Sequence, residues 1–135
     1  MRLRTLIALF VLAGLAACGT QSADLFAVDR AGSIPGARLS LVVSDGGTVR
    51  CDGRAPVDIS DRELLDARDL QRDLETPAKD ALRLPAGRGS VLQYRVRTPD
   101  GSVAFADDSP RKPAVLDRLM LFVRQIAQAR CGRSR

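Results

Sequence analysis

The chain has 135 residues, a formal net charge of +5 and 45% hydrophobic residues, which fits one small globular domain. It contains no histidine, so the Ser-His-Asp and Cys-His catalytic arrangements are excluded. Three cysteines without histidine also exclude the common Cys/His zinc sites. These features favour a non-enzymatic protein that needs no metal and no cofactor.

The first 17 residues have the pattern of a secretory signal peptide. Arg2 and Arg4 give a basic start, residues 6–13 form an apolar core, and small residues precede Cys18. The apolar run is shorter than the roughly 20 residues that span a bilayer, which makes an uncleaved transmembrane helix the weaker alternative. The sequence therefore predicts a signal peptide at 1–17, a short lipidated tether at 18–23 and a single domain at 24–135.

The end of this leader carries a second pattern. Leu15-Ala16-Ala17-Cys18 resembles the lipobox of bacterial lipoproteins. The resemblance implies cleavage before Cys18 and a diacylglyceryl group on its thiol, which would hold the protein in the cell membrane at its extracytoplasmic face. Two acyl chains anchor a protein stably, at about 0.8 kcal/mol per buried methylene, whereas one chain is marginal. A plain secretory signal with an unmodified cysteine is the alternative.

The remaining cysteines, Cys51 and Cys131, form an even pair once Cys18 is assigned to lipid. Disulfides persist in the oxidising compartments outside the cytoplasm. A bond between two cysteines about 80 residues apart would stabilise the fold by roughly 4–4.5 kcal/mol on the chain-entropy model. We predict a Cys51–Cys131 disulfide, with two free thiols as the alternative.

The first half of the domain begins with strand signals. Residues 25–28 have the composition of a short strand, and residues 39–43 and 48–51 alternate apolar and polar side chains around a glycine turn. A three-residue loop with Gly47 in the left-handed conformation closes such a hairpin. The resulting register places Leu41 opposite Cys51, so that this cysteine faces the core.

A helix is predicted after this hairpin. Ser60 and Glu63 have the spacing of a capping box, and apolar residues recur at helical spacing through Leu74. Its other face mixes acidic and basic residues, which we interpret as a solvated surface rather than a binding patch. Pro77 is expected to end or kink the helix.

The second half repeats the order of hairpin and helix. Residues 91–96 and 102–106 flank a Pro-Asp-Gly turn at 99–101. The helix over 113–130 carries the strongest helical pattern, and Cys131 continues its core-facing stripe. The predicted fold is α+β: an antiparallel sheet of about four strands with two helices, in the order β-β-α-β-β-α, with the helices on one face and one disulfide.

The sheet face away from the helices carries the candidate binding residues Arg50, Arg95 and Arg97. Arginine suits the bidentate recognition of carboxylates or phosphates, and an ordinary solvated face is the alternative. Asp107 and Asp108 are considered as cation ligands or paired carboxylates, but the favoured role is to end a strand and cap the next turn. The face lacks stacking aromatic residues, which argues against nucleic acid as a partner.

A family resemblance covers much of the domain. Tyr94-Arg95-Val96-Arg97, residues 101–107, a proline and a Leu-rich helix are similar in layout to emfourin-type inhibitors of thermolysin-like metallopeptidases, and the glycine-containing loop at 32–36 fits. The resemblance implies inhibition of an envelope peptidase. No inhibitory residue is carried over, because the lipid anchor and the cysteine pair depart from that family's pattern. The expected function is therefore a lipid-anchored interaction module of the cell envelope with an envelope or secreted protein partner, and peptidase inhibition is the alternative.

Overall fold

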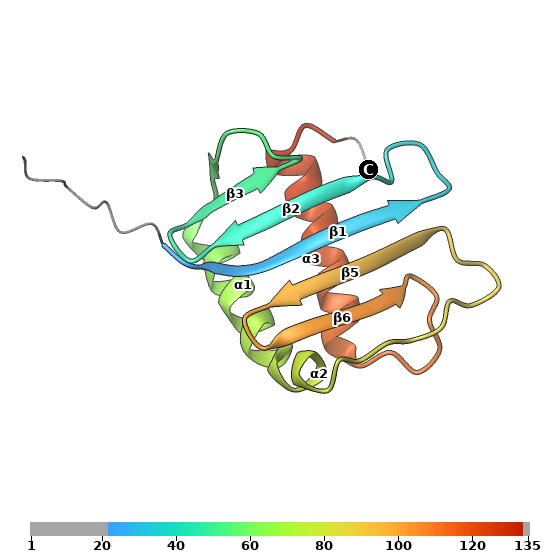
Figure 1. The fold of residues 1–135 in the computed structure, drawn as a ribbon. Helices are drawn as coiled ribbons and strands as arrows, with labels where there is room; N and C mark the ends of the chain where they lie inside the picture. The colour runs from blue at the N-terminus through green and yellow to red at the C-terminus, as the bar shows by residue number, and fades with distance from the viewer. Residues whose placement is uncertain (1–21, 134–135) are drawn as a thin grey trace, which may run out of the picture.

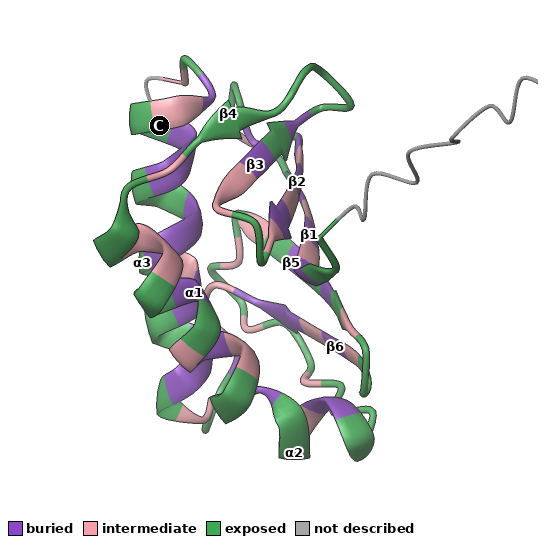
Figure 2. Ribbon diagram, turned by 90° about the vertical axis from the view of Figure 1, so that its left-hand side faces the viewer, coloured by how far each residue is buried: buried purple, intermediate pink, exposed green. Residues whose placement is uncertain are grey.

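An antiparallel sheet and the helices that cover one of its faces build the domain (Figure 1). The computed structural model describes residues 22–133. In it α1 (Asp61–Asp73) and α3 (Ala114–Arg130) lie side by side behind the sheet, which gives two layers (Figure 2). The predicted signal peptide, the lipidation at Cys18 and most of the tether lie outside the described residues. Within residues 22–133, none of the helices has the length and apolar character needed to span a bilayer.

The sheet of the described residues has six strands, not about four, in the order β4-β3-β2-β1-β5-β6. The strands are β1 (Asp24–Gly32), β2 (Leu39–Ser44), β3 (Thr48–Cys51), β4 (Val57–Asp58), β5 (Leu92–Thr98) and β6 (Gly101–Ala106). The prediction of a short first strand was wrong in length, because β1 continues through Asp29 and Arg30 to Gly32. These two charged residues interrupt the apolar run in the sequence, yet β1 pairs with β2 on one side and β5 on the other as the centre of the sheet.

Both predicted hairpins form, and the predicted register of the first is confirmed. Leu41 pairs with Cys51, and Gly47 has a φ of +85° in the turn. In the second hairpin Tyr94 pairs with Phe105, and their rings stack on the helix-facing side with centroids 5.0 Å apart. The alternation of side chains in all these strands therefore sends one set to the core and the other to the uncovered face.

The helices begin where the sequence predicts. Ser60 caps α1 with both bonds of a capping box: the Glu63 N–H donates to Ser60 Oγ at 3.2 Å, and the Ser60 N–H donates to Glu63 Oε2 at 2.7 Å. The expected total of two helices is corrected to three for the described residues, because α2 (Glu75–Lys79) follows α1 and contains Pro77. Proline is tolerated there since the first-turn N–H groups of a helix have no intrahelical partner.

The core lies between the sheet and α3. The buried stripe of α3 faces the strands, and the Phe122 ring meets the Phe26 ring of β1 edge-on with centroids 6.0 Å apart. Each fully buried large aliphatic or aromatic side chain contributes about 1.5–3 kcal/mol relative to an exposed one. All residues of the core cluster lie between Leu25 and Cys131, so the chain after the tether contains the whole core of the described domain.

The predicted disulfide is confirmed. Cys51 at the end of β3 is bonded to Cys131 at the end of α3, with Cα atoms 5.7 Å apart. Arg54 reinforces this junction, because its Nη2 donates to the Cys131 carbonyl oxygen at 3.2 Å. Gly132 follows with a φ of +66° and ends the helix. The last turn of α3 is therefore held covalently against the edge of the sheet.

Candidate functional site

The three predicted arginines lie on the uncovered face but do not form one strip. Arg50 is on β3, while Arg95 and Arg97 are on β5, and both β2 and β1 run between them. Through the register, the row of Arg50 continues across Val42 and Ala27 to Arg97. The structure therefore brings Arg95 and Arg97 together and leaves Arg50 three strands away.

Carboxylates of β1 neutralise two of these arginines. Arg97 Nη1 lies 3.0 Å from Asp29 Oδ2, and Arg50 Nη2 lies 3.9 Å from Asp24 Oδ1. The Asp29 and Asp24 side chains project from the central strand, whose length the sequence pattern understated. Arg95 makes no ion pair with any residue of the described part of the chain, although its Cα partner in β1 is Asp29.

A groove of about 710 Å³ on the uncovered face surrounds Arg95. We term it the open-face groove, and small, charged and a few large apolar residues line it. Its bordering residues include Asp29, Ala31, Arg38, Ser40, Asp52, Ala86, Gln93, Arg95, Ala104 and Ala106. The groove occupies the half of the sheet in which β1 ends, away from Asp24, where the chain enters the sheet (Figure 1). The volume falls within the range of common ligand sites.

Arg38 is a functional candidate that the sequence prediction missed. It directly precedes β2, is exposed, and makes no ion pair within residues 22–133. The signal that points to it is the alternation in β2: Leu39 is buried, so Arg38 and Ser40 flank it on the uncovered face. Arg38 and Arg95 are therefore the cations of the groove that no described carboxylate neutralises.

The groove's second carboxylate, Asp52, has partners of its own. Its Oδ1 accepts a hydrogen bond from the Ser40 N–H at 3.0 Å, and its Oδ2 pairs with Arg133. The Ser40 N–H and the Arg133 guanidinium together outweigh partial burial and lower the pKa of Asp52. Asp52 is therefore ionised at neutral pH, and its charge is compensated from within the chain.

Asp107 and Asp108 hold a loop instead of forming a cation site. Asp108 accepts hydrogen bonds from the Gly87 and Gly89 N–H groups at 2.9 and 2.8 Å, and Asp107 accepts one from the Val91 N–H at 3.2 Å. These bonds fix the loop at 87–91 to the residues that follow β6, and the neighbouring Ala86 lines the open-face groove. Among residues 22–133 no group of three or more possible metal-binding side chains is present.

The loop at 33–37, singled out for its glycines, faces the helices. Arg30 is 5% exposed, and its Nε and Nη2 donate to the carbonyl oxygens of Ala37 at 2.8 Å and Gly36 at 3.1 Å. Gly32 ends β1 directly before this loop, and an added Cβ there would lie 2.1 Å from the Val91 carbonyl oxygen, so only glycine fits. Between this loop and α3 lies a second hollow of about 540 Å³, which we term the helix–loop cleft.

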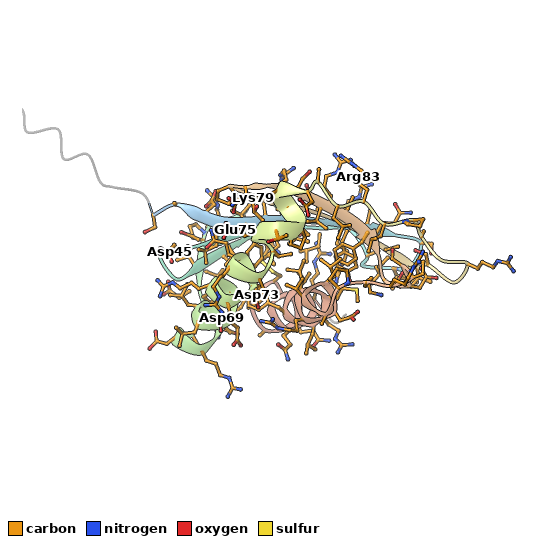
Figure 3. The ribbon with its side chains drawn as sticks, turned by 90° about the horizontal axis from the view of Figure 1, so that it is seen from below. Asp45, Asp69, Asp73, Glu75, Lys79 and Arg83 are labelled. Carbon is orange, nitrogen blue, oxygen red and sulfur yellow. A yellow bond between two sulfur atoms is a disulfide. The ribbon has the colours of Figure 1, made fainter. Side chains whose placement is uncertain are left out.

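Many charged side chains around α1 and α2 are exposed and paired with one another, which agrees with the interpretation of this surface as a solvated face. Figure 3 views the molecule from below and labels Asp45, Asp69, Asp73, Glu75 and Lys79 of this surface. Its ion pairs join Arg68 to Asp45, Arg72 to Asp69, Arg118 to Asp73 and Lys79 to Glu75. All these side chains are at least one-third exposed, and exposed pairs contribute at most about 1 kcal/mol. Arg62 and Asp66 of α1 are exposed and form no ion pair among residues 22–133.

No family model, curated protein or solved structure matches this chain.

Proposed function

We propose that this chain is a lipid-anchored, non-enzymatic binding module of the bacterial cell envelope, which is attached through Cys18 and binds an acidic segment of an envelope or secreted protein. The binding surface is the open-face groove. The observation that carries the proposal is the charge pattern of this groove, in which the carboxylates are compensated and the arginines Arg38 and Arg95 are not.

The charge pattern favours an anionic partner. Asp29 pairs with Arg97 at 3.0 Å, and Asp52 pairs with Arg133, so neither carboxylate compensates Arg38 or Arg95 among the described residues. An acidic segment that enters the groove pairs its carboxylates with the two guanidinium groups without first breaking an ion pair. Guanidinium groups also bind carboxylates through two parallel hydrogen bonds, which adds geometric selectivity.

The spacing of the two arginines favours a chain segment over a single small anion. Arg38 leads into β2 and Arg95 lies on β5, with β1 between these strands. Neighbouring strands are about 4.8 Å apart and residues along a strand about 3.3 Å apart. Arg95 lies in one row with Asp29 and Ser40, two residues along from Arg38, so the backbone positions of Arg38 and Arg95 are roughly 12 Å from each other. Two acidic side chains on an extended peptide span such a distance, whereas one carboxylate does not.

The proposed anchor sets the direction in which the groove faces. The tether between Cys18 and the first residue of β1 is five residues long, residues 19–23, and it reaches at most about 17 Å when fully extended. The end of the sheet at Asp24 is then held near the membrane, and the groove lies in the opposite half, around Asp29 and Ala31. This geometry leaves the groove accessible to proteins of the envelope.

Site-specific photocrosslinking in the cells that make the protein tests the proposal. A photoreactive amino acid at Gln93, in the groove, is expected to form a protein adduct, and the same amino acid at Gln125, on the exposed side of α3, is not. Arg95→Gln should reduce the Gln93 adduct at least fivefold. The matched control is Arg62→Gln, which removes an exposed α1 arginine that makes no ion pair among the described residues.

The outcomes separate the parts of the proposal. Equal crosslinking at both positions, or an adduct that is insensitive to Arg95→Gln, would refute the groove as the binding surface. Identification of the adduct by mass spectrometry distinguishes an envelope assembly protein from a metallopeptidase, which would indicate an inhibitor. Independently, Cys18→Ala should abolish metabolic labelling with a fatty-acid analogue and release the protein from the membrane fraction, and retention of both would refute the anchor.

A further inference from the structure

The chain between α2 and β5 extends the uncovered face beyond its last strand. Residues 82–84 run beside β6, which is at one edge of the sheet. The Leu84 N–H donates to the Ala104 carbonyl oxygen, and the Ala104 N–H donates to the Leu82 carbonyl oxygen, both at 2.9 Å. Through these bonds Arg83 and Ala104 form a parallel bridge. Arg83 therefore has the position of a residue on one more strand of the sheet.

The side chain of Arg83 lies on the uncovered face. Residues paired across a sheet project to the same side, and Ala104 lines the open-face groove. Leu82 and Leu84 are partly buried against the core, whereas Arg83 between them is exposed. Figure 3 shows Arg83 pointing away from α3. Its guanidinium group is therefore presented on the same face as that of Arg95.

Arg83 and Arg95 lie in one row of the sheet, and neither has an ion-pair partner among residues 22–133. Asp80, at the end of α2, is close to Arg83 in the sequence but does not pair with it. Arg95 pairs with Ala104 and Ala104 with Arg83, so the side chain between the two arginines is a methyl group. Two strand spacings of about 4.8 Å place the two arginine backbones roughly 10 Å apart. A partner can therefore reach both guanidinium groups over a residue that does not obstruct the row.

Positive charge exceeds negative charge along this row and in the groove beside it. Asp29 and Asp52 are the carboxylates that border the groove, and each has an arginine partner, Arg97 or Arg133. Even counted in full, these two negative charges are outnumbered by five arginines: Arg38, Arg83, Arg95, Arg97 and Arg133. Adding Asp108, which holds the loop at 87–89, still leaves an excess of positive charge. This part of the face therefore attracts a segment that carries several negative charges.

We propose that Arg83 is a third binding residue of this surface, and that the partner's acidic segment crosses the sheet from Arg38 over β1, β5 and β6 to Arg83. This path rests on the proposed function and defines the charge pattern of the partner. The backbones of Arg38 and Arg83 are roughly 20 Å apart, with Arg95 between them. An extended chain of about seven residues covers this distance. The segment therefore carries at least three acidic side chains, one near each end and one near its middle.

A path along a strand would reach fewer of these charges. β5 carries Gln93, Arg95 and Arg97 on its uncovered face, and Arg97 lies 3.0 Å from Asp29. A carboxylate at Arg97 must compete with Asp29, whereas carboxylates at Arg83 and Arg95 displace no ion pair of the described residues. The path across the strands meets three arginines of this kind, and the charge pattern therefore favours it.

Photocrosslinking of the full-length protein in the cells that make it tests this path. A photoreactive amino acid at Ala104, on β6, should form an adduct with the same protein as the one at Gln93. Mass spectrometry should map both adducts to one segment of that protein with at least three acidic residues. The same amino acid at Thr48, in the other half of the sheet, should form no adduct with this segment. Arg83→Gln should reduce the Gln93 adduct at least threefold, and the exposed control Arg62→Gln should leave it unchanged.

The results distinguish a wrong path from a wrong binding surface. A Gln93 adduct that decreases in Arg95→Gln but is the same in Arg83→Gln and Arg62→Gln would overturn the path to Arg83 and leave the groove as the binding surface. Adducts at Gln93 and Ala104 that map to different proteins would also overturn the path. A Gln93 adduct that is absent or insensitive to Arg95→Gln would refute the proposed function, and the path with it. Because Arg83 is exposed, Arg83→Gln should retain the thermal unfolding midpoint of the parent, which separates lost binding from lost folding.

Discussion

The two faces of the sheet differ in what determines the environment of their side chains. On the face that packs against α1 and α3, strands such as β2 and β3 carry apolar side chains at every second position, and Leu41, Val43 and Val49 are completely buried there. On the uncovered face, the same strands carry charged and small residues whose environment depends on the neighbouring strand. Asp29 of β1, for example, determines that Arg97 of β5 is compensated. Whether a side chain is buried thus depends on its position along its own strand. Whether a charge is compensated depends on the residues of the neighbouring strands.

This difference also separates stability from recognition. Side chains of the covered face contribute to the free energy of folding through burial, which has no requirement for a specific partner. The arginines of the uncovered face contribute little to stability, because exposed ion pairs are worth at most about 1 kcal/mol. The uncovered face is therefore free to place Arg38 and Arg95 without ion-pair partners among the described residues, at little expense to folding.

Removal of the disulfide should have the largest effect on the covered face. The double variant Cys51→Ser/Cys131→Ser loses a crosslink between residues separated by 80 positions. Its free energy of unfolding is expected to be roughly 4 kcal/mol lower. Urea unfolding of the chain from Gly19 onward, followed by circular dichroism, measures this loss. Dithiothreitol should lower the midpoint of the parent and leave that of the double variant unchanged. A reductant-insensitive parent would contradict the prediction.

The next largest effect compares the two faces directly with the same substitution at adjacent residues. Val43 is completely buried under the helices, and Val42 is half-buried on the uncovered face. Val43→Ala should lower the free energy of unfolding by roughly 2–3 kcal/mol, because it removes two buried methyl-sized groups and leaves a cavity. Val42→Ala should lower it by about 1 kcal/mol or less. Equal losses in urea unfolding would mean that the uncovered face is packed against something in solution.

The covered face was largely predictable because its signals are local. Alternation and a glycine turn fixed the first hairpin register, the Ser60 and Glu63 pair fixed the start of α1, and an even number of remaining cysteines pointed to the disulfide. β1 was the exception. The inward-facing residue after Val28 is Arg30. Because Arg30 is charged, the alternation of apolar residues predicts that the strand ends before it.

The candidate site was predicted only in part, for a related reason. Arg95 was recognised from its position on the outer side of β5, but its freedom from ion pairs depends on Asp29, which pairs with Arg97. Arg38 precedes its strand by one residue and therefore fell outside the alternating segment. With β1 assigned as a short strand, the sequence supplied no way to place Asp24 and Asp29 between β3 and β5. Pairing of charges across a sheet requires the strand order, which the sequence pattern does not contain.

The smallest expected effect is the dependence of stability on pH, which comes from the carboxylates of Asp52 and Glu63. The Ser40 N–H and Arg133 lower the pKa of Asp52 against partial burial. Burial opposes the ionisation of Glu63, but its bonds from Arg130, 2.7 Å away, and from Ser60 lower its pKa overall. Groups with a lowered pKa in the folded state stabilise the fold above their unfolded pKa, about 4, and lose that contribution as the pH falls through the folded value.

Stability should therefore change little between pH 7 and 5 and decrease below about pH 4. Asp52→Asn should lower the urea midpoint at pH 6 and reduce the further decrease between pH 4 and 2.5, because the substituted amide does not titrate. Asp66→Asn is the control, since Asp66 is exposed on α1 and forms no ion pair within the described part of the chain. If the acid decrease were equally steep in Asp52→Asn and Asp66→Asn, the contact of Asp52 with Ser40 and Arg133 would not contribute to folding. Both aspartates lose one negative charge on substitution, so a difference between the variants isolates the local contacts from the change in net charge.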